Sequence, residues 1–474
     1  MPGTWADPAV LPQIRLRAGG QALPRSAATH VVTMLALCRP DDVYAGVPPV
    51  REICDPASLA EFAWALFRGW ENAGFPAKDG WVLTALGLLG DDAVVRELSP
   101  LIRAWPGEGG HARATAALDV LAGIGTDLAL LHLNSIAQKV KFKGLKLKAQ
   151  EKIAAVAEGL GLSAEQLADR LVPELGLDEA ATAVIDYGSR RFVVGFDEQL
   201  KPYVTDPDGK PRKALPKPGA KDDTALAAAE YQRFSALKKD VRAVAADQIS
   251  RLETAMVLGR RWPAAEFEQL LAGHPLLWHL VRRVVWRTTA GETFRCAEDR
   301  TYATAEDDGY VLPPDAEVGV AHPLELGAEL ADWSAVFADY EILQPFPQLG
   351  RPVATLDDAE KSETTLKRFE GLKVPVGKVL GLTQRGWVRG EPQDAGIECW
   401  ISRPAPGGVS VVVGLDPGIA VGDVTWEPEQ VLGTIWLDDT GGGHWRRSGS
   451  ARPFGDLDPV TTSEVLADLE GLTR

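Results

Sequence analysis

The polar side chains of residues 339–351 have the types and spacing best suited to holding a ligand. This segment, DYEILQPFPQLGR, sets acids, amides and an arginine between apolar residues and prolines. Gln344 and Gln348 could present amides in a groove, and Arg351 could pair with a carboxylate or another anion. The alternative is a structural loop in which the prolines fix the path and the polar side chains satisfy backbone groups. Because loops often carry binding residues, this segment is the first candidate for a functional surface.

A second candidate is the segment LTQRGWVRGE, in which Arg385, Trp387 and Arg389 occupy every second position. On a β-strand, side chains at this spacing share one face. Such a face could stack on a nucleic-acid base or bind an acidic partner. The alternative is an exposed ladder of cation–π contacts with a structural role.

The histidines do not have the spacing of a metal site. His274 and His279 lie five residues apart, whereas a helical zinc site needs ligands four apart or cysteine partners, and His322 is distant from both. The segment TDPDGK begins like a calcium loop, but position twelve counted from Asp206 is Lys217, which is not a bidentate acid. We expect structural roles for the histidines, a hairpin turn at TDPDGK, and no metal.

Signatures of nucleophilic or cofactor chemistry are missing from the sequence. It contains no G-x-S-x-G motif, no cysteine–histidine pairing signature and no dinucleotide fingerprint, and no pair of carboxylates stands out as an acid and a base. The Gly-rich segment 438–447 lacks the phosphate-loop pattern and is typical of a turn. We expect no catalytic residues and no cofactor. The alternative is an enzyme of unknown reaction with a site near Asp339–Arg351 and His322.

Six lysines lie within residues 139–152, in a stretch that is free of acids before Glu151. They alternate with apolar residues around a glycine, which predicts an extended segment or a broken helix with its charge on one side. Lys141, Lys143 and Lys146 could dock an acidic partner or the acidic half of the chain itself. The alternative is that they bind a nucleic acid. A solvated face with buried aliphatic stems is the structural interpretation.

Composition limits these alternatives. The 474 residues carry 50 Lys and Arg against 66 Asp and Glu, a formal net charge of -16, which argues against general binding of polyanions. No signal peptide is evident at the N-terminus, and no apolar run approaches the roughly 20 residues that span a bilayer. The four cysteines are far apart, without a C-x-x-C motif, as is typical of reduced thiols in a cytoplasmic protein.

The first part of the chain has the pattern of helices. Residues 1–55 are an irregular or helical lead-in, after which Asp55 is the expected N-cap of a helix that begins at Pro56. Within residues 56–178, an αα-hairpin pattern recurs about every 35 residues, with glycines at matching places: Gly90, Gly125 and Gly161. Since one hairpin cannot bury its apolar face alone, the repeat predicts a short HEAT-like helical array.

Residues 179–474 have the pattern of a mixed domain. Short β-rich runs include a hairpin at Asp208-Gly209 and are followed by a long helix from about Asp223 to Leu258. Strands dominate from Gly291, and a final helix is expected to begin with Ser463 as N-cap. This segregated order predicts an α+β domain with antiparallel strands.

The motifs together resemble the DUF4132 family. The segments that carry the resemblance are KVKFKGLKLKAQEKI, DPDGKPRKALPKP, HPLLWHLVRRVVW, AHPLEL, DYEILQPFPQLGR and SEVLADLEGL. They occur in the expected order from about Glu61 to the end. Family members are usually longer, with more helical repeats and sometimes a WGR domain, so the chain is similar to the C-terminal half of the family.

The resemblance implies a function only in outline. Members include a protein described as a molybdate metabolism regulator, and they are often encoded beside a MoxR-type AAA ATPase and a von Willebrand A protein. The family has no agreed catalytic residues to transfer. We therefore expect a cytoplasmic, non-catalytic regulatory protein that binds another protein, with no membrane contact and no nucleic acid.

Overall fold

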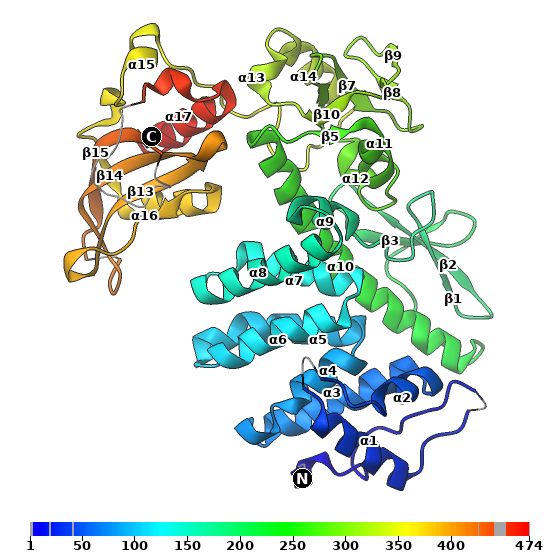
Figure 1. Cartoon of the computed structure of the whole chain (residues 1–474). Helices are drawn as coiled ribbons and strands as arrows, with labels where there is room; N and C mark the ends of the chain where they lie inside the picture. The colour runs from blue at the N-terminus through cyan, green and yellow to red at the C-terminus, as the bar shows by residue number, and fades with distance from the viewer. Residues whose placement is uncertain (1–2, 19, 40–41, 425, 440–451, 474) are drawn as a thin grey trace. The chain divides into compact units, whose positions relative to one another are not determined.

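The computed structural model describes residues 3–18, 20–39, 42–424, 426–439 and 452–473 (Figure 1). It consists of two compact units, residues 1–174 and 175–474, and each is described by itself. In the described part, no helix combines the length and apolarity needed to cross a membrane. Most of the Gly-rich segment 438–447, for which a turn is predicted, lies outside the described residues.

The first unit is built of helices. Asp55 caps the third helix by accepting a hydrogen bond from the backbone N–H of Ser58, and Pro56 is its first residue, as predicted. Phe62, Leu66 and Phe67 are fully buried on this helix. The helices before the repeats are α1 (Arg25–Leu37), α2 (Val47–Ile53) and α3 (Pro56–Asn72).

Three αα-hairpins follow in the region for which the sequence predicts a helical repeat. In each hairpin a glycine ends or follows the first helix, and Asp91, Thr126 or Ser163 caps the second. Gly87 and Gly123 let two first helices approach closely, since a Cβ on Gly87 would lie 3.3 Å from the Cα of Val120. The hairpins pair α4 (Trp81–Leu89) with α5 (Asp92–Ala104), α6 (His111–Ile124) with α7 (Asp127–Lys139), and α8 (Lys143–Gly159) with α9 (Ala164–Arg170).

The lysine-rich stretch is a broken helix, one of the two predicted alternatives, with the break at residues 140–142 and not at Gly144. Lys139 is the last residue of α7, and α8 begins at Lys143 and continues through Gly144. Gly144 occupies the first turn of α8, where a helix tolerates glycine better than in its interior. The apolar positions Leu145, Ala149 and Ile153 are buried at helical spacing.

The second unit begins with a four-stranded antiparallel sheet of order β1-β2-β3-β4. The predicted hairpin at Asp208-Gly209 joins its last two strands, and Gly209 adopts a φ of 81° that suits glycine. The predicted long helix follows as α10 (Thr224–Val257), capped by Asp223. The strands are β1 (Ala183–Asp186), β2 (Arg191–Phe196), β3 (Pro202–Thr205) and β4 (Pro211–Arg212).

A six-stranded sheet of order β5-β10-β6-β7-β8-β9 comes next. Its core is aromatic: Phe267 contacts Trp286 edge to face, with ring centroids 4.7 Å apart. The strands are β5 (Trp262–Pro263), β6 (Trp286–Thr288), β7 (Thr293–Cys296), β8 (Tyr302–Ala303), β9 (Gly309–Tyr310) and β10 (Glu317–Val320). The helices are α11 (Ala264–Glu266), a π-helical turn (Phe267–Ala272), α12 (Trp278–Val281), α13 (Pro323–Leu326) and α14 (Glu329–Asp339).

The chain ends in a five-stranded antiparallel sheet of order β11-β15-β14-β13-β12, with α17 packed on it (Figure 1). Leu466 and Leu469 of the helix share one core with Val411, Val413 and Ile435 of the sheet. The strands are β11 (Lys373–Pro375), β12 (Val388–Arg389), β13 (Ile397–Ala405), β14 (Val409–Ala420) and β15 (Glu429–Asp438). The helices are α15 (Asp358–Ser362), α16 (Val376–Gly381) and α17 (Pro459–Thr473).

The final helix starts earlier than predicted. Ser463 is an interior residue of α17, and its hydroxyl accepts a hydrogen bond from the backbone N–H of Ala354. The predicted N-cap is therefore wrong, because this hydroxyl binds a neighbouring segment instead of its own helix. The α+β class with antiparallel strands is confirmed.

Candidate functional site

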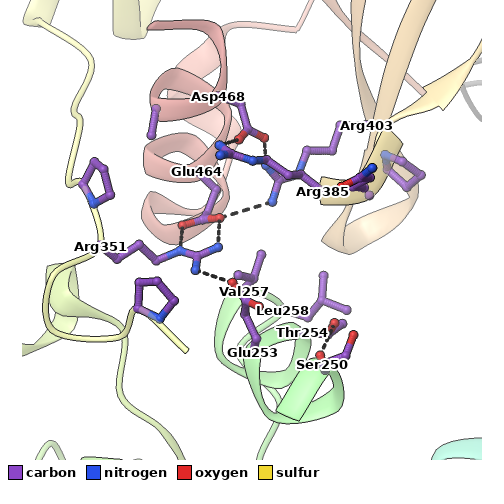
Figure 2. Close-up of a pocket in the computed structure, with 16 residues that line it drawn as sticks. Ser250, Glu253, Thr254, Val257, Leu258, Arg351, Arg385, Arg403, Glu464 and Asp468 are labelled. Atoms are coloured by element: carbon purple, nitrogen blue, oxygen red, sulfur yellow. Dashed lines mark hydrogen bonds and ion pairs between the residues drawn. The ribbon is translucent and has the colours of Figure 1, made fainter. Parts of the chain in front are cut away.

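A cavity of about 520 Å³ lies in the second unit between α10 and α17 (Figure 2). The rest of its wall comes from Pro347, Arg351 and Pro352, from residues 384–386 and 403–404, and from Leu258, the residue after α10. The wall combines six charged side chains with aliphatic groups and three prolines. The charged residues are Glu253, Arg351, Arg385, Arg403, Glu464 and Asp468; the prolines are Pro347, Pro352 and Pro404.

Two acids of α17 organise the charges. Glu464 and Asp468 are four residues apart, so they project from the same face of the helix. Both side chains are almost fully buried. A buried carboxylate needs charged partners and hydrogen bonds to offset its lost hydration. The packing of α17 with these two acids buried therefore requires the surrounding arginines.

Glu464 is held by three side chains from outside its helix. Arg351 donates Nε–H to Oε1 and Nη2–H to Oε2, the latter over 2.8 Å, which is a bidentate pair. The Nε2 atom of His322 lies 3.2 Å from Oε1, and Nη2 of Arg403 lies 3.6 Å from Oε2. Burial opposes ionisation of Glu464, but the hydrogen bonds from Arg351 and His322 outweigh it and lower its pKa to about 2.

Arg351 links α17 to α10. Its Nη1 atom donates to Glu253 of α10 over 2.7 Å while its other nitrogens bind Glu464. Burial alone would lower the pKa of Arg351, but the hydrogen bonds with Glu464 and Glu253 raise it above its ordinary value. The arginine therefore stays charged and joins two helices that are about 200 residues apart in sequence.

Asp468 receives three donors. Nη1 of Arg403 and Nε1 of Trp387 both donate to Oδ2, over 2.7 and 2.8 Å. Arg385 donates Nη1–H to Oδ1 over 2.9 Å. Together with the Glu464 contacts, these bonds join α17, β13 and the turn before β12 in one network (Figure 2).

The structural role predicted for two histidines is confirmed. Nδ1 of His274 accepts hydrogen bonds from the backbone N–H groups of Leu276 and Leu277. His322 caps α13: its Nδ1 accepts from the N–H of Leu324 over 3.2 Å, so Nε2 carries the proton that faces Glu464. His279 is largely buried, and burial together with Arg282 and Arg283 lowers its pKa to about 4.

The predicted amide groove at residues 344–348 is wrong. Gln348 is fully buried and bonds the backbone of Val285 and Ala321, while Gln344 donates to Gln348 and accepts from the N–H of Leu349. Both amides hold the loop together, which is the structural alternative. Of the three polar residues selected in this segment, Arg351 lines the cavity. Asp339, at the end of α14, is outside its wall.

The predicted strand face at residues 385–389 is also wrong. Residues 382–385 form a 3-10 turn, and β12 contains only Val388 and Arg389. Arg385 and Trp387 nevertheless converge, because both donate to Asp468. Arg389 lies apart from the cavity wall and pairs with Glu398.

The selected lysines belong to the first unit. Lys141 and Lys143 are exposed, and Lys146 lines a separate cavity of about 370 Å³ formed by residues of α7, α8 and α9. Two neighbours are paired within the chain, Lys148 with Glu151 and Lys152 with Asp119. This pairing removes part of the positive field that the sequence suggests.

Sequence reasoning missed Glu253, Arg403 and the role of the two acids of α17. In the sequence, Glu464 and Asp468 are recognisable only as acids in the N-terminal half of the predicted final helix. Acids near a helix N-terminus interact favourably with the helix dipole. The sequence did contain a signal of this burial. The two acids are four residues apart and therefore share a helix face, and they are flanked by the apolar residues Val465, Leu466 and Leu469. Their partners come from distant segments and could not be read from local spacing.

The ionic network predicts a specific dependence of stability on pH. Because the pKa of Glu464 falls from 4.5 to about 2 on folding, its ionised form stabilises the native state above pH 4.5. This contribution is lost as the pH decreases from about 4.5 toward 2. We expect the difference in free energy of unfolding between the wild type and Glu464→Gln to be constant from pH 8 to 5.5 and to shrink below pH 4.5. Urea unfolding at each pH measures it; a difference that is unchanged at pH 3 would contradict the assignment.

Comparisons with known proteins identify relatives by sequence. Residues 209–387 match the family model described as "Domain of unknown function (DUF4132)". The chain is 38% identical over 397 residues to "Uncharacterized protein YehI" of Escherichia coli (strain K12), an alignment that covers 82% of this chain and 32% of that protein. The chain thus spans about a third of the length of this curated relative. No solved structure matches the chain.

Proposed function

The chain carries the DUF4132 domain at residues 209–387, and from this premise we propose that it is a non-catalytic regulatory protein that binds another protein. The observation that carries the proposal is the cavity beside α17. Its wall combines aliphatic and proline side chains with charged side chains that are joined in ion pairs.

The paired charges favour binding over acid–base catalysis. A general acid or base needs a pKa near the working pH and an open line to the reacting proton. Glu464 instead has a pKa near 2 and is hydrogen-bonded to Arg351 and His322, and Asp468 already accepts three hydrogen bonds. Thr254, a hydroxyl in the wall, donates to the backbone carbonyl of Ser250.

The proline side chains favour a peptide ligand. Pro347, Pro352 and Pro404 are exposed in the wall, as is Leu258 at the end of α10. Rigid apolar groups beside a few polar ones are typical of recognition surfaces, because they lose little conformational entropy on binding. A segment of a partner protein would cover these groups.

The class of partner is proposed from the family. A MoxR-type AAA ATPase or a von Willebrand A protein is the candidate, since members of DUF4132 are often encoded beside both. The stacked hairpins of the first unit add a second surface of the kind that repeat proteins use for binding proteins. The four cysteines are free, which supports a reducing compartment and the proposed cytoplasmic location.

Photo-crosslinking in the native host tests the proposal. A photoreactive amino acid replaces Leu258, whose side chain is half-exposed in the cavity wall, and the matched control replaces Val311, which is exposed outside it. We expect discrete protein adducts from position 258 and none of the same mass from position 311. No adducts, or identical adducts from both positions, would overturn the proposal. Mass spectrometry of the adduct decides whether the partner is an ATPase.

A further inference from the structure

Arg385 differs from the other arginines of the cavity in its exposure. Its side chain is 64% exposed, whereas those of Arg351 and Arg403 are 18% and 8% exposed. The two inner arginines each contact two acids: Arg351 binds Glu464 and Glu253, and Arg403 binds Asp468 and lies near Glu464. Arg385 is therefore the cation of the wall that solvent, and hence a ligand, can reach.

The network can release Arg385 without leaving a buried charge uncompensated. Asp468 would keep its bonds from Arg403 over 2.7 Å and from Trp387 over 2.8 Å, both on Oδ2. Only the bond between Arg385 and Oδ1 would be exchanged for one to a ligand. By contrast, turning Arg351 outward would leave the buried Glu464 without its bidentate partner, which is costly.

The exposed acid of the wall does not pair with Arg385. Glu253 is 37% exposed, but Nη1 of Arg351 lies 2.7 Å from its carboxylate. The wall has three arginines and three acids and thus no net charge, so exposure, and not an excess of positive charge, distinguishes Arg385. A ligand entering beside Arg385 therefore meets one accessible guanidinium next to apolar surface from Leu258.

We propose that Arg385 binds the carboxylate of an acidic side chain on a segment of the partner protein. A planar guanidinium pairs with a carboxylate through two parallel hydrogen bonds, and the adjacent proline and aliphatic surface covers the rest of the segment. This inference rests on the proposed function and specifies its chemistry. Because Arg385 and Leu258 are both exposed, the ligand chain can continue into solvent on either side, which favours a peptide over an enclosed small acid.

A peptide array tests the assignment with the full chain. Immobilised pentapeptides carry Glu, Gln or Lys at the centre and mixed residues elsewhere, and they are probed with wild type, Arg385→Gln and Arg385→Glu. The matched control is Arg389→Gln, whose arginine pairs with Glu398 outside the cavity. We expect the wild type and the control to prefer Glu over Gln by about tenfold, as one charge-assisted hydrogen-bonded pair provides. Arg385→Gln loses this preference, and Arg385→Glu prefers Lys.

The outcomes separate this inference from the proposed function. If cross-linking at Leu258 captures a protein but the array shows no preference for Glu, the carboxylate assignment is overturned and protein binding stands. If Arg385→Gln keeps the preference, the carboxylate binds elsewhere and the assignment also fails. Succinate serves as a free dicarboxylate: displacement of the peptides by succinate at the peptide concentration would overturn the choice of a protein segment. Matching thermal unfolding of all four proteins establishes that the variants are folded.

Discussion

Replacing Gln348 by leucine is expected to lower the free energy of unfolding by about 2–6 kcal/mol. The amide is fully buried: Oε1 accepts from the N–H of Val285 over 2.9 Å, and Nε2 donates to the carbonyls of Val285 and Ala321, each over 2.8 Å. Leucine would leave the N–H of Val285 and the carbonyl of Ala321 without these bonds in the protein interior, and each such group costs about 1–3 kcal/mol. The carbonyl of Val285 keeps a hydrogen bond from the N–H of Ala321. Guanidinium chloride unfolding followed by tryptophan fluorescence measures the change.

The matched control for this substitution is Gln393→Leu. Gln393 is exposed, and its amide donates to the carbonyl of Glu391 over 3.0 Å. We expect a change within about 0.5 kcal/mol there, as is usual for surface substitutions. A Gln348→Leu protein as stable as the control would show that the amide does not hold the loop, and the rejected groove interpretation would need to be reconsidered.

Replacing Glu464 by alanine is expected to destabilise the second unit by about 3–5 kcal/mol, the usual effect of removing one partner of a buried ion pair. Arg351 would lose its bidentate contact and His322 its acceptor, and Arg403 would lose a neighbouring charge. The residual positive charge stays within the protein, where hydration cannot replace the carboxylate. The same denaturant titration detects the loss as a lower unfolding midpoint.

Asp358→Ala is the control for the removal of a salt-bridged acid. Asp358 pairs with Lys361 over 2.8 Å, but its side chain is 98% exposed, so its contribution is expected to be small. Equal effects of Glu464→Ala and Asp358→Ala would mean that the network beside α17 contributes no more than a surface ion pair. In that case the ion pairs that join α10, α17 and β13 would not hold the cavity wall together.

The sequence correctly predicted those helix starts and turns that depend only on neighbouring residues. Asp55 and Pro56 mark the start of α3, Asp208-Gly209 marks the β3–β4 hairpin, and Asp223 caps a helix of the predicted length. Each of these depends on a few neighbouring residues. The predicted start of α17 was wrong because it relied on local chemistry alone. Ser463 is a residue type that often caps helices, but its hydroxyl binds the N–H of Ala354, which is distant in sequence.

The candidate site could be predicted only in part, because its contacts join distant segments. Arg351 and Arg385 were selected as groups that could bind an anion, and each pairs with an acid of this chain. These acids, Glu464 and Asp468, lie 113 and 83 positions away. Gln348 was selected as a ligand-binding amide, but its side chain hydrogen-bonds to buried backbone groups instead. An amide can serve either purpose. Residue type alone does not distinguish these roles, because burial decides between them.

The measurement that most directly tests the central claim is the position of the cross-link within the partner captured through residue 258. We expect the adducts to map to one short segment of a single protein, with an Asp or Glu within a few residues of the linked position. The yield is expected to fall at least about tenfold in Arg385→Glu and to be unchanged in Arg389→Gln. Adducts scattered over many segments, or a yield indifferent to Arg385, would contradict the claim.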